Sequence, residues 1–502
     1  MGTITLDEYT RYDALGLAEL VRRNEVQPEE LLEVAIAAIE QTNPRLNAVI
    51  ARLYDRARDR IAAGLPTGPF TGVPYLLKDM LDLEGTKVTW GSRLLRNNVS
   101  THTHEILRRM EATGLSFLGR TNMSELGMVP HAEPKAYGPT RNPWDLDRSP
   151  GGSSGGAAAA VAAGVVPMAH AADGGGSIRI PASACGLFGL KPSKGRNPAD
   201  LDEPTDEFVS QHVISRTVRD SAAMLDAIQG ARSFERLQLP APSRPYLEIA
   251  AEPPGTLKIG YSLSDFFGNT VHPDCREAVL ATAGLLTELG HEVEESAPVI
   301  DAESYFHGFQ VLWCASAGFF YEEVRRELGK QERIPAPLRL ALGQRQVLRL
   351  LTSLPTNLSG NPMIEPFTRK LAALDRKHTP ADLMRAWIEM RRAEAELRNF
   401  LSGFDMLLTP VMAEPPWPIG YLKQNWSIPR LQEELLRYVA FTPIANSTGF
   451  PAMSVPLHWS PEGLPIGSHF IAPLGAEDLL FQLAAQLEAA RPWRDRRPPA
   501  FI

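Results

Sequence analysis

Hydrophobic positions along this chain follow two kinds of spacing. Apolar residues recur every three or four positions in several segments, which predicts helices at 14–40, 103–114, 274–289, 379–401 and 477–490. Short apolar runs lie between them and predict strands at 46–53, 73–79, 116–119, 165–169, 257–261, 405–409, 446–456 and 463–471. Strands that alternate with helices are typical of βαβ units. The pattern therefore predicts an α/β fold whose sheet has parallel content.

The second half of the chain is less regular than the first. Residues 300–400 are mostly helical in pattern, and Thr379 followed by Pro380 is the kind of pair that begins a helix. The stretch 410–430 is rich in proline and tryptophan, and we expect it to form a surface loop.

Length, charge and cysteine usage narrow the class of protein. At 502 residues the chain exceeds the usual size of one domain, so either one large core with insertions or two domains are expected. The net charge of −8 comes without a basic run, which argues against a nucleic-acid partner. Three scattered cysteines exclude a disulfide framework and a zinc site. The sequence shows neither a secretion signal nor an apolar run long enough for a membrane span, so we expect a cytoplasmic protein without a membrane partner.

Two glycine clusters, each carrying serine, dominate residues 148–181. The first contains Ser153 and Ser154, and the second, Asp173-Gly-Gly-Gly-Ser177, follows a predicted strand. Glycine lets backbone N–H groups approach a ligand closely. Serine hydroxyls in such turns indicate hydrolase chemistry with an oxyanion pocket. A phosphate loop is disfavoured because the Gly-Lys-Ser/Thr ending is missing.

Other interpretations of these residues remain open at this point. Gly151-Gly-Ser153-Ser-Gly155 also fits the Gly-x-Ser-x-Gly turn of α/β-hydrolase esterases. His170, Asp173 and Ser177 are residue types that form a conventional triad. A non-enzymatic binding protein is a further alternative. A metal site at His102, His104 and Glu105 is disfavoured, because no His-Glu-x-x-His spacing supports it.

Taken together, these motifs resemble the amidase signature family. The matching text is Gly151-Gly-Ser-Ser-Gly-Gly156 and Asp173-Gly-Gly-Gly-Ser-Ile-Arg-Ile-Pro-Ala182, with Gly72-Val-Pro-x-Leu-Leu-Lys-Asp79 upstream. The resemblance continues through Gly-Leu-Lys-Pro192 and, near the C-terminus, Asn446 and Gly463-Leu-Pro-Ile-Gly467, so it covers nearly the whole chain.

The resemblance implies one large α/β domain spanning 1–502. Its fold would be a mixed, mostly parallel twisted sheet between helices, with a core at about 70–220 and a helical insertion at about 300–400. It also implies a hydrolase without cofactor or metal, acting as a monomer or homodimer on a small-molecule amide, carbamate (urethane) or ester.

The resemblance also assigns roles to individual residues. Ser177 corresponds to the nucleophile, Ser153 to a bridging serine that follows a cis peptide bond, and Lys78 to the base. It further implies that the oxyanion is bound by four backbone N–H groups, those of Gly174, Gly175, Gly176 and Ser177. Ser154 anchors its loop, while Asp173 and Arg179 pair behind the turn.

Lys78 can act as a base only as the neutral amine. The pKa of its side chain must therefore fall well below about 10.4, which burial at the end of an apolar strand can achieve. Ser153 would then relay the proton from Ser177 to Lys78 and return it to the leaving amine.

Details of the text resemble the branch of the family that hydrolyses nylon-type 6-aminohexanoate oligomers and urethanes. There a cysteine at the place of Cys314 faces the substrate; the alternative is a small buried side chain between Trp313 and Ala315. We expect the pocket to lie among Gly127, Met128, Val129 and the insertion at 300–360 with Cys314, and the loop 410–430 to form its entrance. An amidotransferase-subunit-like amidase is an alternative, but the tyrosine-rich and Asn-Leu-Ala-Arg text expected for it at 300–360 is not present.

Overall fold

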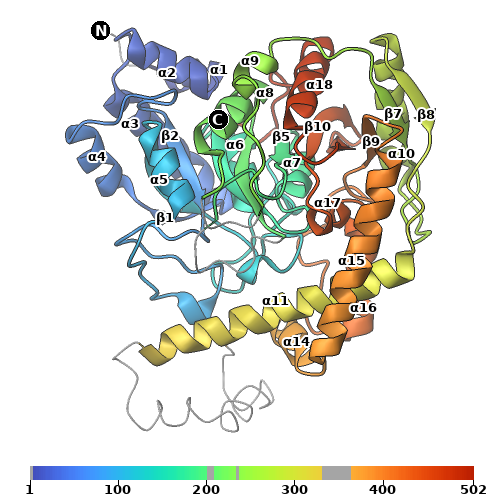
Figure 1. The fold of residues 1–502 in the computed structure, drawn as a ribbon. Coiled ribbons are helices and arrows are strands. Elements are labelled where there is room, and N and C mark those ends of the chain that lie inside the picture. The colour runs from blue at the N-terminus through green and yellow to red at the C-terminus, as the bar shows by residue number, and fades with distance from the viewer. Residues whose placement is uncertain (1–3, 200–207, 233–236, 331–362) are drawn as a thin grey trace.

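Eleven strands form one mixed sheet through the centre of the computed structural model, which describes residues 4–199, 208–232, 237–330 and 363–502 (Figure 1). The strands are β1 (Val49–Arg52), β2 (Pro74–Lys78), β3 (Ser116–Thr121), β4 (Met168–Asp173), β5 (Phe188–Lys191), β6 (Ser210–Ser215), β7 (Lys258–Tyr261), β8 (Glu292–Glu295), β9 (Met406–Pro410), β10 (Ala452–Trp459) and β11 (Pro465–Ile471). Their order across the sheet is β1-β3-β2-β4-β6-β5-β10-β11-β9-β7-β8.

Helices pack against this sheet, so the predicted α/β class is confirmed. The helices are α1 (Leu6–Arg11), α2 (Ala14–Arg22), α3 (Pro28–Leu46), α4 (Tyr54–Ala62), α5 (Glu105–Ala112), α6 (Gly155–Ala162), α7 (Arg179–Cys185), α8 (Val218–Ile228), α9 (Tyr246–Ile249), α10 (Pro273–Glu288), α11 (Ala302–Lys330), α14 (Pro366–Asp375), α15 (Pro380–Phe400), α16 (Ile428–Val439), α17 (Pro443–Ser447) and α18 (Glu477–Ala490). The loops of the described residues also contain two 3₁₀ turns, η1 (Arg93–Leu95) and η2 (Glu125–Gly127).

The sheet is mixed as expected, but it is not mostly parallel. Among the described strands, six of the ten pairings are antiparallel and four are parallel. The parallel pairs are β2 with β3 and β4, and β7 with β8 and β9. The short connection from β10 to β11 can join only antiparallel strands, because a parallel pair needs a crossover.

Several predicted boundaries move in the structure. The helix expected at 14–40 is two helices, because Pro28 occupies the first turn of α3 and begins a new helix there. The strand expected at 446–456 begins only at Ala452, after the short helix α17. The predicted start of α15 is confirmed, since Thr379 accepts a hydrogen bond from the N–H of Asp382 and Pro380 follows it.

The first part of the loop expected on the surface at 410–430 is buried, whereas residues 418–430 are mostly exposed or half-buried. Val411, Met412, Ala413 and Trp417 are all inside the protein. Trp417 stacks on Tyr438 of α16 with ring centroids 3.9 Å apart, so the tryptophan-rich stretch packs on that helix. In residues 410–417 the proline and tryptophan content reflects irregular backbone in a packed environment, which the sequence pattern alone did not distinguish from a surface loop.

The alanine-rich helix α6 positions the first glycine cluster. Every residue of α6 is buried, and Gly156 lies so close to its neighbours that an added Cβ would be 2.5 Å from the backbone nitrogen of Asn122. Small side chains therefore let α6 approach the sheet, where it contacts β2, β3 and β4. The loop before α6 is held at the edge formed by the ends of β2 and β4.

The expected insertion is helical in its described part. The long helix α11 runs across one end of the molecule and packs against α14 and α15 (Figure 1). Residues 331–362 of the expected insertion lie outside the described residues. The extent of the single domain and of its subdivisions stays a prediction. None of the described helices combines the length and apolar character that a membrane span requires.

Candidate active site

Lys78 stands at the carboxyl end of β2, a strand in which every residue is buried. Its side chain is 2% exposed, and its Nζ lies 2.7 Å from the Oγ of Ser153 and 3.2 Å from the carbonyl oxygen of Ala172. Burial lowers the pKa of Lys78 to about 7, although the negative charge of Asp173 acts in the opposite direction. The lysine is therefore able to exist as the neutral amine near neutral pH.

Ser153 is presented by the loop that precedes α6. The peptide bond between Gly152 and Ser153 is cis, as the resemblance implies. Only glycine fits at position 152, because an added Cβ would lie 2.4 Å from the backbone nitrogen of His131. The neighbouring Ser154 Oγ donates to the carbonyl oxygen of Ala172 at 3.3 Å and accepts from the Ala172 N–H at 3.4 Å. Ser154 thus ties this loop to β4.

Ser177 lies in the turn between β4 and α7. The carboxylate of Asp173 closes this turn by accepting the N–H groups of Gly176 at 2.6 Å and Ile178 at 3.1 Å. Gly176 has φ +125°, and an added Cβ would lie 2.3 Å from Thr442 Oγ1, so both conformation and space require glycine. Ser177 itself is partly exposed and faces a cavity.

A buried ion pair lies behind the turn. Arg179 donates from Nε and Nη2 to the two carboxylate oxygens of Asp173, each at 2.9 Å, and both side chains are fully buried. Although burial alone favours a neutral acid, Arg179 and Asn446 hold the pKa of Asp173 below its ordinary value. The carboxylate is therefore charged near neutral pH, and it fixes the glycine turn.

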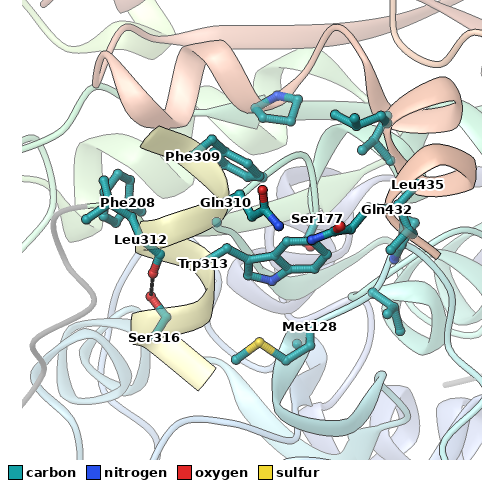
Figure 2. A pocket seen from close by; sticks show the side chains of 18 of the residues that line it. Met128, Ser177, Phe208, Phe309, Gln310, Leu312, Trp313, Ser316, Gln432 and Leu435 are labelled. Atoms are coloured by element: carbon teal, nitrogen blue, oxygen red, sulfur yellow. Dashed lines mark hydrogen bonds between the residues drawn. The ribbon is translucent and has the colours of Figure 1, made fainter. Parts of the chain in front are cut away.

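The cavity next to Ser177 has a volume of about 180 Å³ and is lined mainly by apolar and aromatic side chains (Figure 2). Among the described residues no Asp, Glu, Lys, Arg or His lines it. Gly127, Met128 and Val129 form part of its wall, where they were expected, and Trp313 of α11 covers another part. The walls come mainly from the loop after η2, from α11 and from α16.

Two features expected at this pocket do not line it among the described residues. Cys314 is fully buried in the apolar cluster beneath the wall, because successive residues of a helix point about 100° apart and Trp313 takes the direction of the cavity. Burial raises the pKa of the Cys314 thiol to about 12. The loop 410–430 does not line the cavity among the described residues; the following helix α16 does.

Comparison with known proteins agrees with this geometry. The model of the family described as Amidase matches residues 30–481. The chain belongs to the amidase family. This amidase is 35% identical to 6-aminohexanoate-cyclic-dimer hydrolase of Paenarthrobacter ureafaciens, across 97% of the chain and 96% of the relative.

Two solved structures resemble the amidase over nearly its whole length. A 6-aminohexanoate cyclic dimer hydrolase superposes with a TM-score of 0.88 at 34% identity, covering 98% of this chain and 99% of the other. A bacterial aryl acylamidase of the amidase signature enzymes superposes with a TM-score of 0.82 at 27% identity, covering 97% and 98%. The protein is an amide-hydrolysing enzyme.

The alternative triad of His170, Asp173 and Ser177 does not form. His170 and Asp173 are three positions apart on β4 and so point to opposite faces of the sheet. The His170 Nε2 lies 3.1 Å from Oε1 of Gln211, while Asp173 pairs with Arg179. Burial, with the charge of Lys78 adding to it, lowers the pKa of His170 to about 3. The histidine is a neutral core residue of the amidase.

The oxyanion donors expected from the resemblance are not all free. The Gly176 N–H is engaged by the Asp173 carboxylate, because that bond closes the turn. In the described part of the chain no hydrogen bond joins the N–H groups of Gly174, Gly175 and Ser177 to protein acceptors. These three amides, at the cavity wall, remain candidates for binding a developing negative charge.

Three further residues hold the turn and were not assigned roles from the sequence. Thr442 Oγ1 donates to the carbonyl oxygen of Gly175 at 2.8 Å, and Asn446 donates to the carbonyl oxygen of Asp173 at 2.8 Å. His469 of β11 accepts through Nε2 from Arg179 at 2.9 Å, so its proton lies on Nδ1, 3.0 Å from the Thr409 hydroxyl. Asn446 belongs to the matched motif text; Thr442 and His469 carry no local signal.

Proposed function

We propose that this amidase cleaves neutral amides through an acyl-enzyme formed on Ser177. The observation that carries the proposal is the buried 2.7 Å contact between Lys78 Nζ and Ser153 Oγ, beside a cavity that Ser177 faces. A serine hydroxyl is a weak nucleophile until a base removes its proton. Neutral Lys78 supplies that base, and Ser153, whose Oγ is within hydrogen-bond distance of Lys78 Nζ, acts as the relay.

The proton movements in the proposed reaction balance as follows. The Ser177 proton passes to Ser153 Oγ as the Ser153 proton passes to Lys78 Nζ, and Ser177 Oγ bonds to the substrate carbonyl carbon. When the C–N bond breaks, the proton returns along the same path to the leaving amine. Water then attacks the acyl-enzyme with the same residues as base, releasing the acid and restoring Ser177.

Backbone amides stabilise the charge that develops on the carbonyl oxygen in this proposal. The unengaged N–H groups of Gly174, Gly175 and Ser177 are the donors, and one such donor in other hydrolases is worth about 3 kcal/mol. Asp173, Arg179 and Ser154 act through the backbone, since they hold the two serine loops without facing the cavity. Their role is to position the reacting groups.

The cavity supports a neutral substrate with apolar groups on either side of the amide. No charged side chain in the described wall is available to pair with a carboxylate or an ammonium group. Carbamates, aryl esters and cyclic 6-aminohexanoate-type oligomers are uncharged and present a carbonyl to Ser177 in the same way, so we include them as substrates. A cytoplasmic location and a monomeric or homodimeric assembly stay predictions from the sequence.

The proposal is tested with matched p-nitroanilide amides and p-nitrophenyl esters and carbamates of one acyl series. We expect hydrolysis of all three classes by the natural enzyme and loss of turnover by about 10³-fold or more in Ser177→Ala. A fluorophosphonate probe should label the natural enzyme and leave Ser177→Ala unlabelled. Labelling of both proteins, or equal turnover, would reject Ser177 as the nucleophile.

A further inference from the structure

Gln432 places a primary amide in the part of the cavity wall that α16 forms, which is otherwise apolar. The residues of α16 that line the cavity include Gln432, Leu435, Leu436 and Val439, which have the spacing of one helix face. A leucine at 432 would complete this apolar stripe. An apolar side chain would pack this part of the wall better than the amide does, so packing does not explain the glutamine.

The donor of this amide is buried and unused. Gln432 Nε2 has no hydrogen-bond partner among the described residues, although buried N–H groups in proteins are nearly always paired. Neighbouring polar groups of the cavity do have partners. Ser316 Oγ donates to the Leu312 carbonyl at 3.0 Å (Figure 2). The Tyr305 hydroxyl lies 3.1 Å from Ser447 Oγ.

A second amide reaches the same cavity from the other side. Gln310 extends from α11 into the space, and Gln432 extends toward it from the wall that also carries Leu435 (Figure 2). The Gln310 side chain makes no hydrogen bond within the part of the chain that the structure describes. Two neutral amides thus face one cavity whose described wall carries no charged side chain.

We propose that Gln432 donates a hydrogen bond from Nε2 to a second carbonyl oxygen of the substrate. Gln310 is the second polar side chain of this subsite, which we call the amide subsite. This inference rests on the proposed function, which places the scissile carbonyl at Ser177. A carboxylate at the amide subsite would enter the cavity without a counter-charge, whereas a neutral carbonyl needs only a hydrogen-bond donor. The favoured substrates are uncharged molecules that carry two amide or carbamate groups.

The test compares two substrates and three variants. One substrate is an N-acyl p-nitroanilide with a second amide in its acyl chain; the other has the same length with methylenes in place of that amide. In Gln432→Leu we expect the ratio of kcat/KM for the diamide to that for the monoamide to fall about tenfold, which corresponds to one hydrogen bond of about 1.4 kcal/mol. Gln432→Glu, which lacks the donor when ionised, should lower the same ratio. Glu433→Leu, on the exposed side of α16, should leave it unchanged.

Binding provides a second readout that does not depend on turnover. In a Ser177→Ala background, the Kd of the diamide should rise about tenfold when Gln432→Leu is added. Equal changes in Kd for diamide and monoamide, or an unchanged kcat/KM ratio in both Gln432 variants, would overturn the proposed amide subsite. Either result would leave the proposed function standing. A natural enzyme that hydrolyses neither substrate, or a Ser177→Ala variant that hydrolyses both, would overturn the proposed function itself.

Discussion

Asp173 and Arg179 meet in a fully buried, two-point ion pair, and the turn that carries Ser177 lies between them. The same carboxylate accepts the Gly176 and Ile178 N–H groups, so one side chain joins the end of β4 to the start of α7. Arg179 continues outward to the Thr442 carbonyl and to His469. The position of Ser177 therefore depends on a charge pair that does not face the cavity.

Removing the arginine should destabilise the hydrogen-bond network that holds the turn of Ser177. In Arg179→Met the Asp173 carboxylate stays buried without its counter-charge, a change that typically costs about 3–5 kcal/mol. We expect the free energy of unfolding to fall by that amount and kcat to fall with it, because the turn loses its fixed geometry. Denaturant unfolding curves and steady-state kinetics on a p-nitroanilide measure the two effects.

A double-mutant cycle separates the pair from the rest of the network. Asp173→Asn combined with Arg179→Met removes both charges. The double variant should therefore lose less free energy of unfolding than the two single variants lose together. Additive losses would mean that the two charges do not depend on each other, and this interpretation of the turn would be wrong.

The pH dependence of turnover should follow Lys78. With the pKa of Lys78 lowered to about 7 by burial, the neutral amine is the minor form below pH 7 and the major form above it. We expect kcat/KM to rise about tenfold per pH unit below 7 and to level off above it. A pH–rate profile between pH 5 and 9 on a substrate without titratable groups measures this curve.

Lys78→Met provides the matched control for that profile. The methionine fills similar volume without a base, so turnover should fall by about 10²–10⁴-fold and the rise near pH 7 should disappear. The variant should remain folded, since it removes a buried cation that loses hydration on folding. Full activity in Lys78→Met, or a flat profile in the natural enzyme, would exclude the lysine as the base.

The local parts of this site were accessible from the sequence because they are short in sequence. Lys78 ends an apolar strand, and Asp173, Ser177 and Arg179 fall within seven residues, so one turn brings them together. The parallel neighbours β2 and β4 end at the same edge of the sheet, which places Lys78 next to the glycine loops. The alternation of helices and strands does not give the order of the strands in the sheet. Only the resemblance indicated that Lys78 and the two glycine loops belong to one site.

Other parts depend on packing that the pattern does not encode. His469 meets Arg179 only because β11 pairs with β9 and lies beneath α7. Cys314 was misplaced because resemblance does not fix which side of α11 faces the cavity, and its neighbour Trp313 is one helical step away. The mostly parallel sheet was implied by the resemblance, whereas the alternation predicted only parallel content; in the structure β6 pairs antiparallel with both β4 and β5.

Substrate choice should respond to Met128 and not to Cys314. Met128 lines the cavity, so Met128→Ala enlarges it and should shift preference toward bulkier acyl chains by about tenfold, the scale of one or two methylenes. Cys314→Ala removes a small buried side chain and should lower stability by about 1 kcal/mol. A series of acyl p-nitroanilides measured with both variants tests this, and a changed substrate ranking in Cys314→Ala would contradict it.

A buried carboxyl beside the pocket should make stability depend on pH. Glu125, in η2 just before Leu126 and Gly127, accepts hydrogen bonds from the Glu365 N–H and the Thr368 hydroxyl, each at 2.8 Å, and from Ser92. It thereby caps the first turn of α14 and fastens the pocket loop to that helix. Burial first, and the negative charge of Glu365 second, raise the pKa of Glu125 to about 7.

The sign of the effect follows from proton binding. Between pH 4.5 and 7 the folded protein holds the Glu125 proton more often than the unfolded chain does, so stability falls as pH rises through this window. The loss attributable to Glu125 is on the order of 3 kcal/mol. In Glu125→Gln the oxygen can still accept from α14 while the amide donates to Ser92, so the variant should lose less stability than the natural enzyme from pH 5 to 8. Denaturant unfolding at both pH values measures the difference, with exposed Glu433→Gln as control; parallel losses in all three proteins would show that Glu125 does not hold the extra proton.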